Sequence, residues 1–235
     1  MVNIEQTLYS DNTNDLKYMN IKTQIDELFK GNEMDQNDFN QLLNDLKEKE
    51  MINYFCSYLN LKRCEGQFEL TKETFTQLKE IIESIMKNIT NIEENYNSIR
   101  YCLILTQTYY YSNGNEKVYI SNSFKYIDMF KQREFWEYFF AKNLSKELLV
   151  MKNKSQKLKV NVVFSNLLSL VHNMTEVKVQ KIIIKDLINV LGKQYVLKEQ
   201  MNNEIMMLVE NYKDEDTVQL LSSGNDNVNE QEGKM

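Results

Sequence analysis

The sequence predicts an all-α protein, a single domain of about eight to ten helices in an irregular array. Proline is absent and only six glycines occur in 235 residues, so the chain has few of the residues that turn the strands of sandwiches and barrels. Apolar residues recur at spacings of three and four, the period of an amphipathic helix. A hydrophobic content of 42% is enough to fill a core.

Five helices are expected in the first half of the chain. The first ends at Gly31-Asn32, because glycine readily adopts the positive φ of a helix C-terminus. Asp35 caps the second, and Thr71 or its neighbour begins the fourth. By residue number the five helices cover 21–29, 36–46, 52–64, 72–89 and 92–111.

The segment 111–117 contains Asn113-Gly114, a pair that favours positive φ and a tight turn or hairpin tip. Residues 117–120 could form a short strand. Neither flank alternates cleanly between apolar and polar residues, and a single hairpin is marginal in water. The sequence therefore favours a loop here.

Further helices are expected after this loop, with a break at a lysine-rich linker. One starts at Ser121 or Ser123 and passes through Phe130, and the next is the most aromatic stretch of the chain. The later ranges are 134–151, 162–174, 177–191 ending at Gly192, and 197–212. The linker 152–159 is the best candidate for an internal boundary within a helical domain of residues 21–212. Residues 1–20 are expected to be a mobile segment and 213–235 an acidic disordered tail.

The charge and cysteine content limit the classes of function. A net charge of −6 opposes the counterion release that drives nucleic-acid binding, so nucleic acid is a poor partner. No secretory leader and no run of about 18 apolar residues is found, which predicts a cytoplasmic protein without a transmembrane segment. Cys56, Cys64 and Cys102 form no CxxC pair and are expected to be free thiols in or near the core.

Motifs for catalysis, metals and cofactors are missing from the sequence. One histidine and three scattered cysteines do not make a zinc site, and neither GxGxxG nor a P-loop lysine motif occurs. His172 is the only imidazole and is expected to be a neutral histidine at the inner edge of an apolar helix. Glu134 and Glu137 lie one turn apart, as paired acids could, but a solvated face is the favoured interpretation.

A run of lysines occupies the linker 152–159. It could lie against anionic lipid or an acidic partner, since each lysine contributes a modest attraction to a negative surface. A plain solvated linker needs no partner, and the sequence alone favours that simpler interpretation.

Several segments, taken in order, resemble a known helical domain. They are Ile52–Arg63, Glu73-Thr74-Phe75, Ser98–Tyr110, Arg133–Phe140 and Phe164–Met174. In these segments the chain resembles the helical domain of the SET-binding-factor proteins, which are myotubularin-related, DENN-containing pseudophosphatases, and a small cytosolic brain protein made of little else. The likeness covers roughly residues 50–212. Phe-Trp-Glu and His-Asn-Met are its most specific parts.

This resemblance implies a non-catalytic helical module in the cytoplasm, linked in its larger relatives to membrane traffic and small-GTPase signalling. The motif residues are expected to be structural or interaction anchors. They are Tyr109, Tyr110, Phe135, Trp136, Phe139 and His172.

The sequence thus predicts an adaptor or regulatory module that binds protein partners and uses neither cofactor nor metal. One alternative is a structural protein that forms homo-oligomers through an exposed Met-rich stripe on the last helix, made of Met201, Ile205, Met206 and Leu208. A less favoured alternative is an enzyme in which His172 and Glu176 share a pocket.

Overall fold

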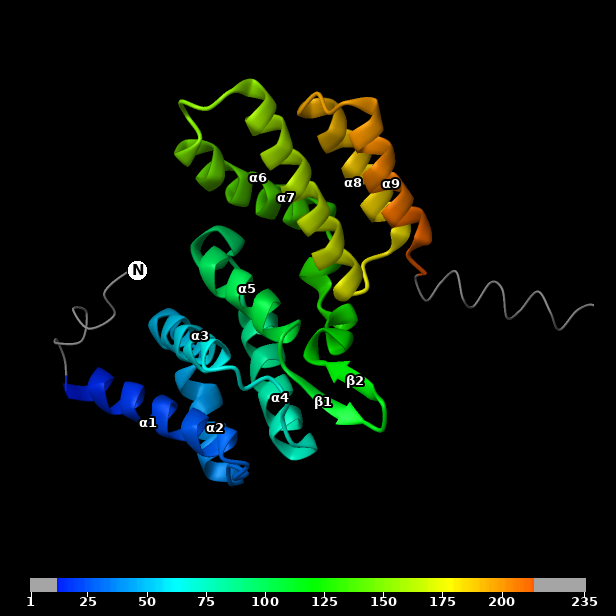
Figure 1. The fold of residues 1–235 in the computed structure, drawn as a ribbon. Coiled ribbons are helices and arrows are strands. Elements are labelled where there is room, and N and C mark those ends of the chain that lie inside the picture. The colour runs from blue at the N-terminus through cyan, green and yellow to red at the C-terminus, as the bar shows by residue number, and fades with distance from the viewer. Residues whose placement is uncertain (1–11, 214–235) are drawn as a thin grey trace, which may run out of the picture. The chain divides into compact units, whose positions relative to one another are not determined.

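The computed structural model describes residues 12–213, and the internal contacts of the chain divide it between Phe124 and Lys125 into two compact units (Figure 1). The predicted all-α class is confirmed, since the described residues are mostly helical and contain one small two-stranded sheet. No helix among them is long and apolar enough to cross a bilayer. The two units are described separately below.

The first unit consists of five α-helices and a hairpin. The helices are α1 (Asn12–Phe29), α2 (Gln36–Asp45), α3 (Lys49–Cys64), α4 (Lys72–Asn88) and α5 (Ile92–Thr106), followed by β1 (Tyr110–Asn113) and β2 (Glu116–Tyr119). The predicted caps are present, because Asp35 accepts hydrogen bonds from two amides of α2 and Thr71 accepts one from the amide of Thr74. The αL turn predicted at Gly31 also forms, with φ of 85°.

The core of the first unit lies where α3 packs against α1 and α5, and α4 packs against α5 and the hairpin. Each helix contributes the apolar stripe that its spacing predicts. The residues of this core that are fully excluded from solvent include Ile21, Ile25, Leu42, Phe55, Leu59, Leu78, Ile82, Ile99 and Leu105.

The first helix is longer than predicted. It begins at Asn12, inside the segment 1–20 that the sequence suggested was mobile. Polar residues hide this extension from a search for apolar periodicity, yet the added turns have partners on α3 and just before it. Tyr18 contacts Tyr54 at 4.8 Å between ring centroids, and Lys17 forms an ion pair of 2.5 Å with Glu48. The remaining residues 1–11 lie outside the described part.

The prediction of a loop at 111–117 is wrong, because this segment is part of an antiparallel hairpin. Tyr110 pairs with Tyr119 across the strands, and Gly114 in the tip has φ of 64°. A third segment supports the hairpin, since the amide of Leu70 donates to the carbonyl of Tyr110, and the amide of Tyr110 donates to Phe68. This outer pairing supplies the stability that an isolated hairpin lacks.

The second unit contains four α-helices after a pair of tight turns. The α-helices are α6 (Arg133–Val150), α7 (Gln156–Glu176), α8 (Lys181–Gln194) and α9 (Glu199–Asn211). The α-helix predicted through Phe130 is instead two 3₁₀ helices, η2 (Ile120–Tyr126), which spans the division between the units, and η3 (Asp128–Lys131). Ile127 separates them with an extended ψ of 111°, which a continuous helix could not include.

The core of the second unit is aromatic. α6 packs against η3, α7 and α8, while α9 packs against α7 and α8. Trp136 is fully buried and donates its indole N–H to the carbonyl of Phe130 at 2.8 Å. The rings of Phe130 and Phe135 contact the indole at centroid distances of 5.6 and 4.8 Å. This arrangement satisfies the polar edge of the largest buried side chain.

The structure differs from the sequence at a predicted boundary and at a predicted helix end in the second unit. The segment 152–159 joins α6 to α7 within this unit, and its last four residues belong to α7, so the division of the chain falls earlier, after Phe124. Gly192 does not end its helix, because α8 continues to Gln194. A Cβ at Gly192 would lie 2.5 Å from the Oδ1 atom of Asn202, so this glycine allows α9 to approach closely.

Candidate functional site

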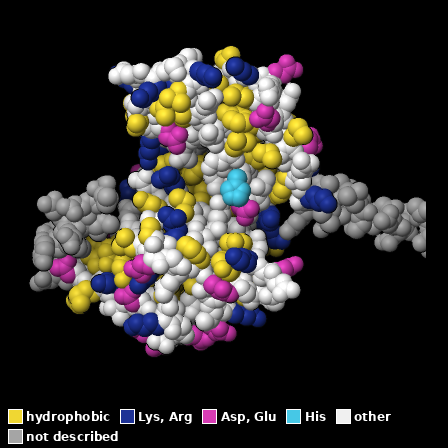
Figure 2. Space-filling model, in the orientation of Figure 1, with side chains coloured by type: hydrophobic (Ala, Val, Ile, Leu, Met, Phe, Trp, Pro, Cys, Tyr) yellow, Lys and Arg dark blue, Asp and Glu magenta, His cyan; other side chains and the backbone are white. Residues whose placement is uncertain are grey.

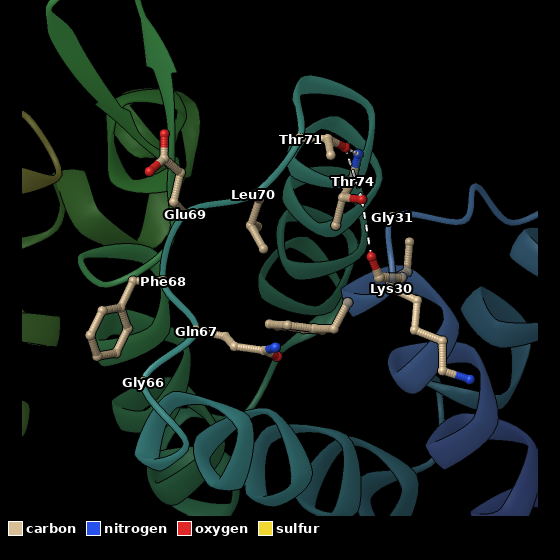
Figure 3. A pocket seen from close by; sticks show the side chains of 11 residues that line it. Lys30, Gly31, Gly66, Gln67, Phe68, Glu69, Leu70, Thr71 and Thr74 are labelled. Carbon is tan, nitrogen blue, oxygen red and sulfur yellow. Dashed lines mark hydrogen bonds between the residues drawn. The ribbon is translucent and has the colours of Figure 1, made fainter.

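An open hollow in the first unit lies between the end of α1, the segment 66–71 and the start of α4. Its volume is about 330 Å³. A second hollow of about 280 Å³ adjoins it, shares Phe29, Lys30 and Gln67, and extends to Asp26 and Lys62. Figure 3 shows Gln67 extending from the connecting segment toward the end of α1, with Phe68 on the other side of that segment. We call the two spaces together the α1–α3 hollow.

Two glycines form the borders of the α1–α3 hollow. Gly31 follows α1 with φ of 85°, and Gly66 follows α3 with φ of 86°. Both helices therefore end in a left-handed residue that redirects the chain, which is the usual role of glycine at a helix C-terminus. The extended segment 67–70 then runs along the hollow to Thr71, the cap of α4.

Buried hydrogen bonds hold the walls of the hollow in place. Thr74 donates its hydroxyl to the carbonyl of Leu28 at 3.1 Å and so satisfies one of the last carbonyls of α1. Phe29 contacts the ring of Tyr109 edge-on at 5.4 Å. Tyr109 in turn donates its hydroxyl to the carbonyl of Leu59 on α3 at 2.9 Å. The hollow is thus built on a rigid base, as a binding site requires.

The charged groups at the rim are already engaged with one another. Lys62 lies 2.8 Å from a carboxylate oxygen of Asp26, which also accepts a 2.8 Å hydrogen bond from Tyr58. Burial alone would raise the pKa of Asp26, but the hydrogen bonds from Lys62 and Tyr58 lower it below its usual value. Burial and the hydrogen bond to Asp26 raise the pKa of Tyr58 to about 12. The lowered pKa makes the Asp26 carboxylate a weak proton acceptor, which does not suit a general base near neutral pH.

The predicted anchors Tyr109 and Tyr110 both lie in the first unit and have different environments. Tyr109 is fully buried behind the hollow, and burial raises its pKa well above the usual value for tyrosine. Tyr110 is half-buried on β1, where its ring contacts Tyr119 at 5.4 Å and the ammonium group of Lys117 at 4.4 Å. Tyr109 supports the wall of the hollow, and Tyr110 supports the hairpin.

The aromatic anchors of the second unit are buried on α6. Phe135, Trp136 and Phe139 are almost entirely excluded from solvent and contact one another at centroid distances of 4.8 to 6.1 Å. They form part of a packed core, and their rings are not presented to a partner.

His172 differs from its predicted place, because it is exposed on α7 and visible at the surface in Figure 2. Its neighbours Val171 and Met174 occupy the buried side of the helix instead. It lines neither part of the α1–α3 hollow. Glu137 pairs with Arg133 at 2.7 Å, and Arg133 also contacts Asp186 at 2.5 Å. Glu137 therefore belongs to a surface ion-pair network between α6 and α8, whereas Glu134 is exposed.

The cysteines are free, but they are not all in the core. Cys56 and Cys102 are buried with their sulfur atoms 3.7 Å apart, whereas Cys64 is exposed at the end of α3. Within residues 12–213 no group of three or more histidine, cysteine or acidic residues is arranged to hold a metal ion.

The Met-rich stripe suggested for α9 is not a single exposed face. Ile205 is fully buried and Met201 and Met206 are half-buried, while Met207 and Leu208 are exposed. The apolar residues that α9 exposes are thus different from most of those predicted.

In comparisons with known proteins, no family model, curated protein or solved structure matches the chain. The candidate site therefore depends on its geometry. Sequence reasoning missed the α1–α3 hollow, although Gly31 and Gly66 each carried a signal, since both follow an apolar helical stripe and mark a change of chain direction.

Proposed function

We propose that the protein is a non-catalytic adaptor or regulatory module that binds a protein partner at the α1–α3 hollow. The observation that carries this proposal is an open hollow on a rigid base, bordered by an extended segment and by side chains suited to contacts. Phe68 is 41% exposed, and Gln67 offers an amide that both donates and accepts hydrogen bonds. A cytoplasmic location, expected from the sequence, and a role in membrane traffic or small-GTPase signalling, which the resemblance alone implies, belong to the same proposal.

The test is affinity purification of the tagged full-length protein from its own cells with chemical cross-linking. Gln67→Trp places a bulky ring in the hollow, while Gln36→Trp makes the same change at an exposed position of α2. We expect a protein partner that cross-links to segment 66–71, is retained by Gln36→Trp and is lost with Gln67→Trp. Recovery of the same proteins with both variants would refute the hollow as the site.

Self-association is a second candidate function, favoured by exposed apolar residues on the last two helices. Ile182, Met207 and Leu208 each expose more than half of their side chains. Exposed apolar groups of this kind often mark contacts between protein molecules. Light scattering of the wild type and of Met207→Ser/Leu208→Ser tests it, and a wild-type monomer at all concentrations would exclude it.

A further inference from the structure

A second surface of the molecule combines exposed apolar side chains with a local excess of positive charge. It is the connection between α6 and α7, which comprises Leu149, Val150, Leu158 and the lysines of segment 152–159. Leu149 is 73% and Val150 83% exposed. We call this surface the α6–α7 tip. It is separate from the α1–α3 hollow, and the inference drawn from it does not depend on the proposed function.

The α6–α7 tip is an ordered turn. The amide of Met151 donates to the carbonyl of Glu147 at 3.2 Å, and the amide of Lys154 donates to Met151 at 3.0 Å. Ser155 then caps α7 by accepting a hydrogen bond from the amide of Leu158. The ammonium group of Lys159 reaches back to the carbonyl of Lys152 at 3.3 Å. The exposed apolar side chains are therefore displayed on a closed backbone, which lowers the entropy lost when a partner binds.

The charge of this region is opposite to that of the chain. Between residues 142 and 159 there are six lysines and one acidic residue, Glu147, although the whole protein carries −6. The carboxylate of Glu147 accepts a hydrogen bond from Asn166 at 2.8 Å. Lys152, Lys154 and Lys157 are exposed, and within the described residues no salt bridge links them to an acidic group. α7 then has no charged residue from 160 to 171, so the positive charge is concentrated at the tip.

We propose that the α6–α7 tip is a docking site for a bilayer surface that contains anionic lipids. The aliphatic side chains of Leu149 and Val150 can enter the boundary between headgroups and acyl chains, while the surrounding lysines remain among the negative headgroups. Two signals act together, as stable but reversible attachment to a membrane requires. In the orientation of Figure 1 this connection lies at the upper left, and Figure 2 shows basic and apolar side chains next to each other on that part of the surface.

The composition of the tip favours a bilayer over a nucleic acid. Nucleic-acid surfaces use arginine and aromatic rings to pair with phosphates and to stack on bases. From 141 to 163 the chain contains neither arginine nor an aromatic residue. Exposed aliphatic side chains gain little from a sugar–phosphate backbone, but they gain burial in lipid.

The test is co-sedimentation of the full-length protein with vesicles of phosphatidylcholine alone and of phosphatidylcholine mixed with phosphatidylserine. We expect binding to the mixed vesicles only, weakened by added salt because charges near the surface are screened. Lys152→Gln/Lys154→Gln/Lys157→Gln should reduce the partition coefficient about a hundredfold, at about fivefold for each lysine. Lys178→Gln/Lys193→Gln/Lys198→Gln, which removes three exposed lysines elsewhere in the second unit, is the matched control and should bind like wild type.

The apolar contribution is tested with Leu149→Ser/Val150→Ser. Its control is Leu16→Ser/Met19→Ser, which changes two exposed apolar residues of α1. We expect only the first variant to lose binding, with unchanged circular dichroism for both. A fluorophore on Val150→Cys, in a Cys64→Ser background, should shift to the blue with mixed vesicles. No sedimentation with mixed vesicles, equal binding by the lysine variant and its control, or binding by the tip solely to an acidic protein would overturn the proposal.

Discussion

Single residues in this protein are fixed by hydrogen bonds that a sequence does not display. Tyr109 and Trp136 were both predicted as anchors, but their partners are backbone carbonyls, of Leu59 and Phe130 respectively. A backbone carbonyl can accept a hydrogen bond from any side chain that reaches it. The spacing of apolar residues in the sequence therefore identifies the buried ring but not its hydrogen-bond partner. A similar limit explains His172. Apolar residues of α7 such as Val162, Phe164 and Leu168 lie outside its buried stripe, so apolar spacing does not show which edge of the helix meets solvent.

Tyr109→Phe should lower the free energy of unfolding by about 1 to 2 kcal/mol, because the carbonyl of Leu59 loses its buried donor. Urea denaturation measures the change. Tyr126→Phe, at an exposed position, is the control and should have almost no effect. Equal stability of Tyr109→Phe and wild type would show that water replaces the hydroxyl.

Asp26 makes a pH-dependent contribution to stability. Its folded pKa is lowered, so the stabilisation is fully present above the unfolded value of about 4 and is lost as the pH falls through the folded value. Asp26→Asn should therefore flatten the acid side of the stability–pH curve. Chemical denaturation at a series of pH values between about pH 2 and pH 7 measures the free energy of unfolding on this acid side. The exposed Asp38→Asn serves as control, and identical acid limbs for both variants would contradict the prediction.

At the level of helices and strands, apolar spacing predicted most of the helical segments. The prediction failed at the polar start of α1 and at the paired strands of the hairpin. The stripes of α3, α4 and α8 are found buried as expected. The first turns of α1 depend on contacts with Tyr54 and Glu48, and the hairpin depends on Phe68 and Leu70, more than 35 residues earlier in the chain. Such non-local partners cannot be recognised by reading a window of sequence.

The turn between α8 and α9 contains a strained residue. Val196 has φ of 50°, a left-handed conformation that a β-branched side chain disfavours, and its side chain is 80% exposed. Val196→Gly should raise the free energy of unfolding by about 1 kcal/mol, since it removes this strain and loses little packing. Thermal unfolding measures the gain. Leu158→Gly, in the regular first turns of α7, should be destabilising instead, and a loss of stability in Val196→Gly would exclude strain as the main effect.

The whole molecule divides differently from the division that composition suggested. The lysine-rich segment 152–159 has the polarity of a linker, but α6 and α7 pack against each other on either side of it. The actual division lies between Phe124 and Lys125, in a stretch rich in aromatic residues that has no linker-like composition. Polarity predicts exposure of a segment, whereas a boundary depends on which contacts cross it.

Two compact units should respond separately to core mutations. Trp136→Ala removes the largest buried side chain and should destabilise the second unit by about 3 to 5 kcal/mol. Phe55→Ala should act in the same way on the first unit. Hydrogen exchange followed by mass spectrometry can resolve the two sets of helices. Loss of protection in both units at once from either variant would mean that the units unfold as one.

The two buried cysteine thiols of the first unit give the protein an internal chemical reporter of core opening. Cys56 and Cys102 lie 3.7 Å apart in the α3–α5 core, and the hydrogen bond between them, together with burial, raises the pKa of Cys56. Only a thiolate attacks an aromatic disulfide reagent. In the native chain the exposed Cys64 should therefore react quickly and release one equivalent of the aromatic thiolate. Two more equivalents should follow only when this core opens and Cys56 and Cys102 react. The slow phase would then time the opening of the first unit from within, without any added label.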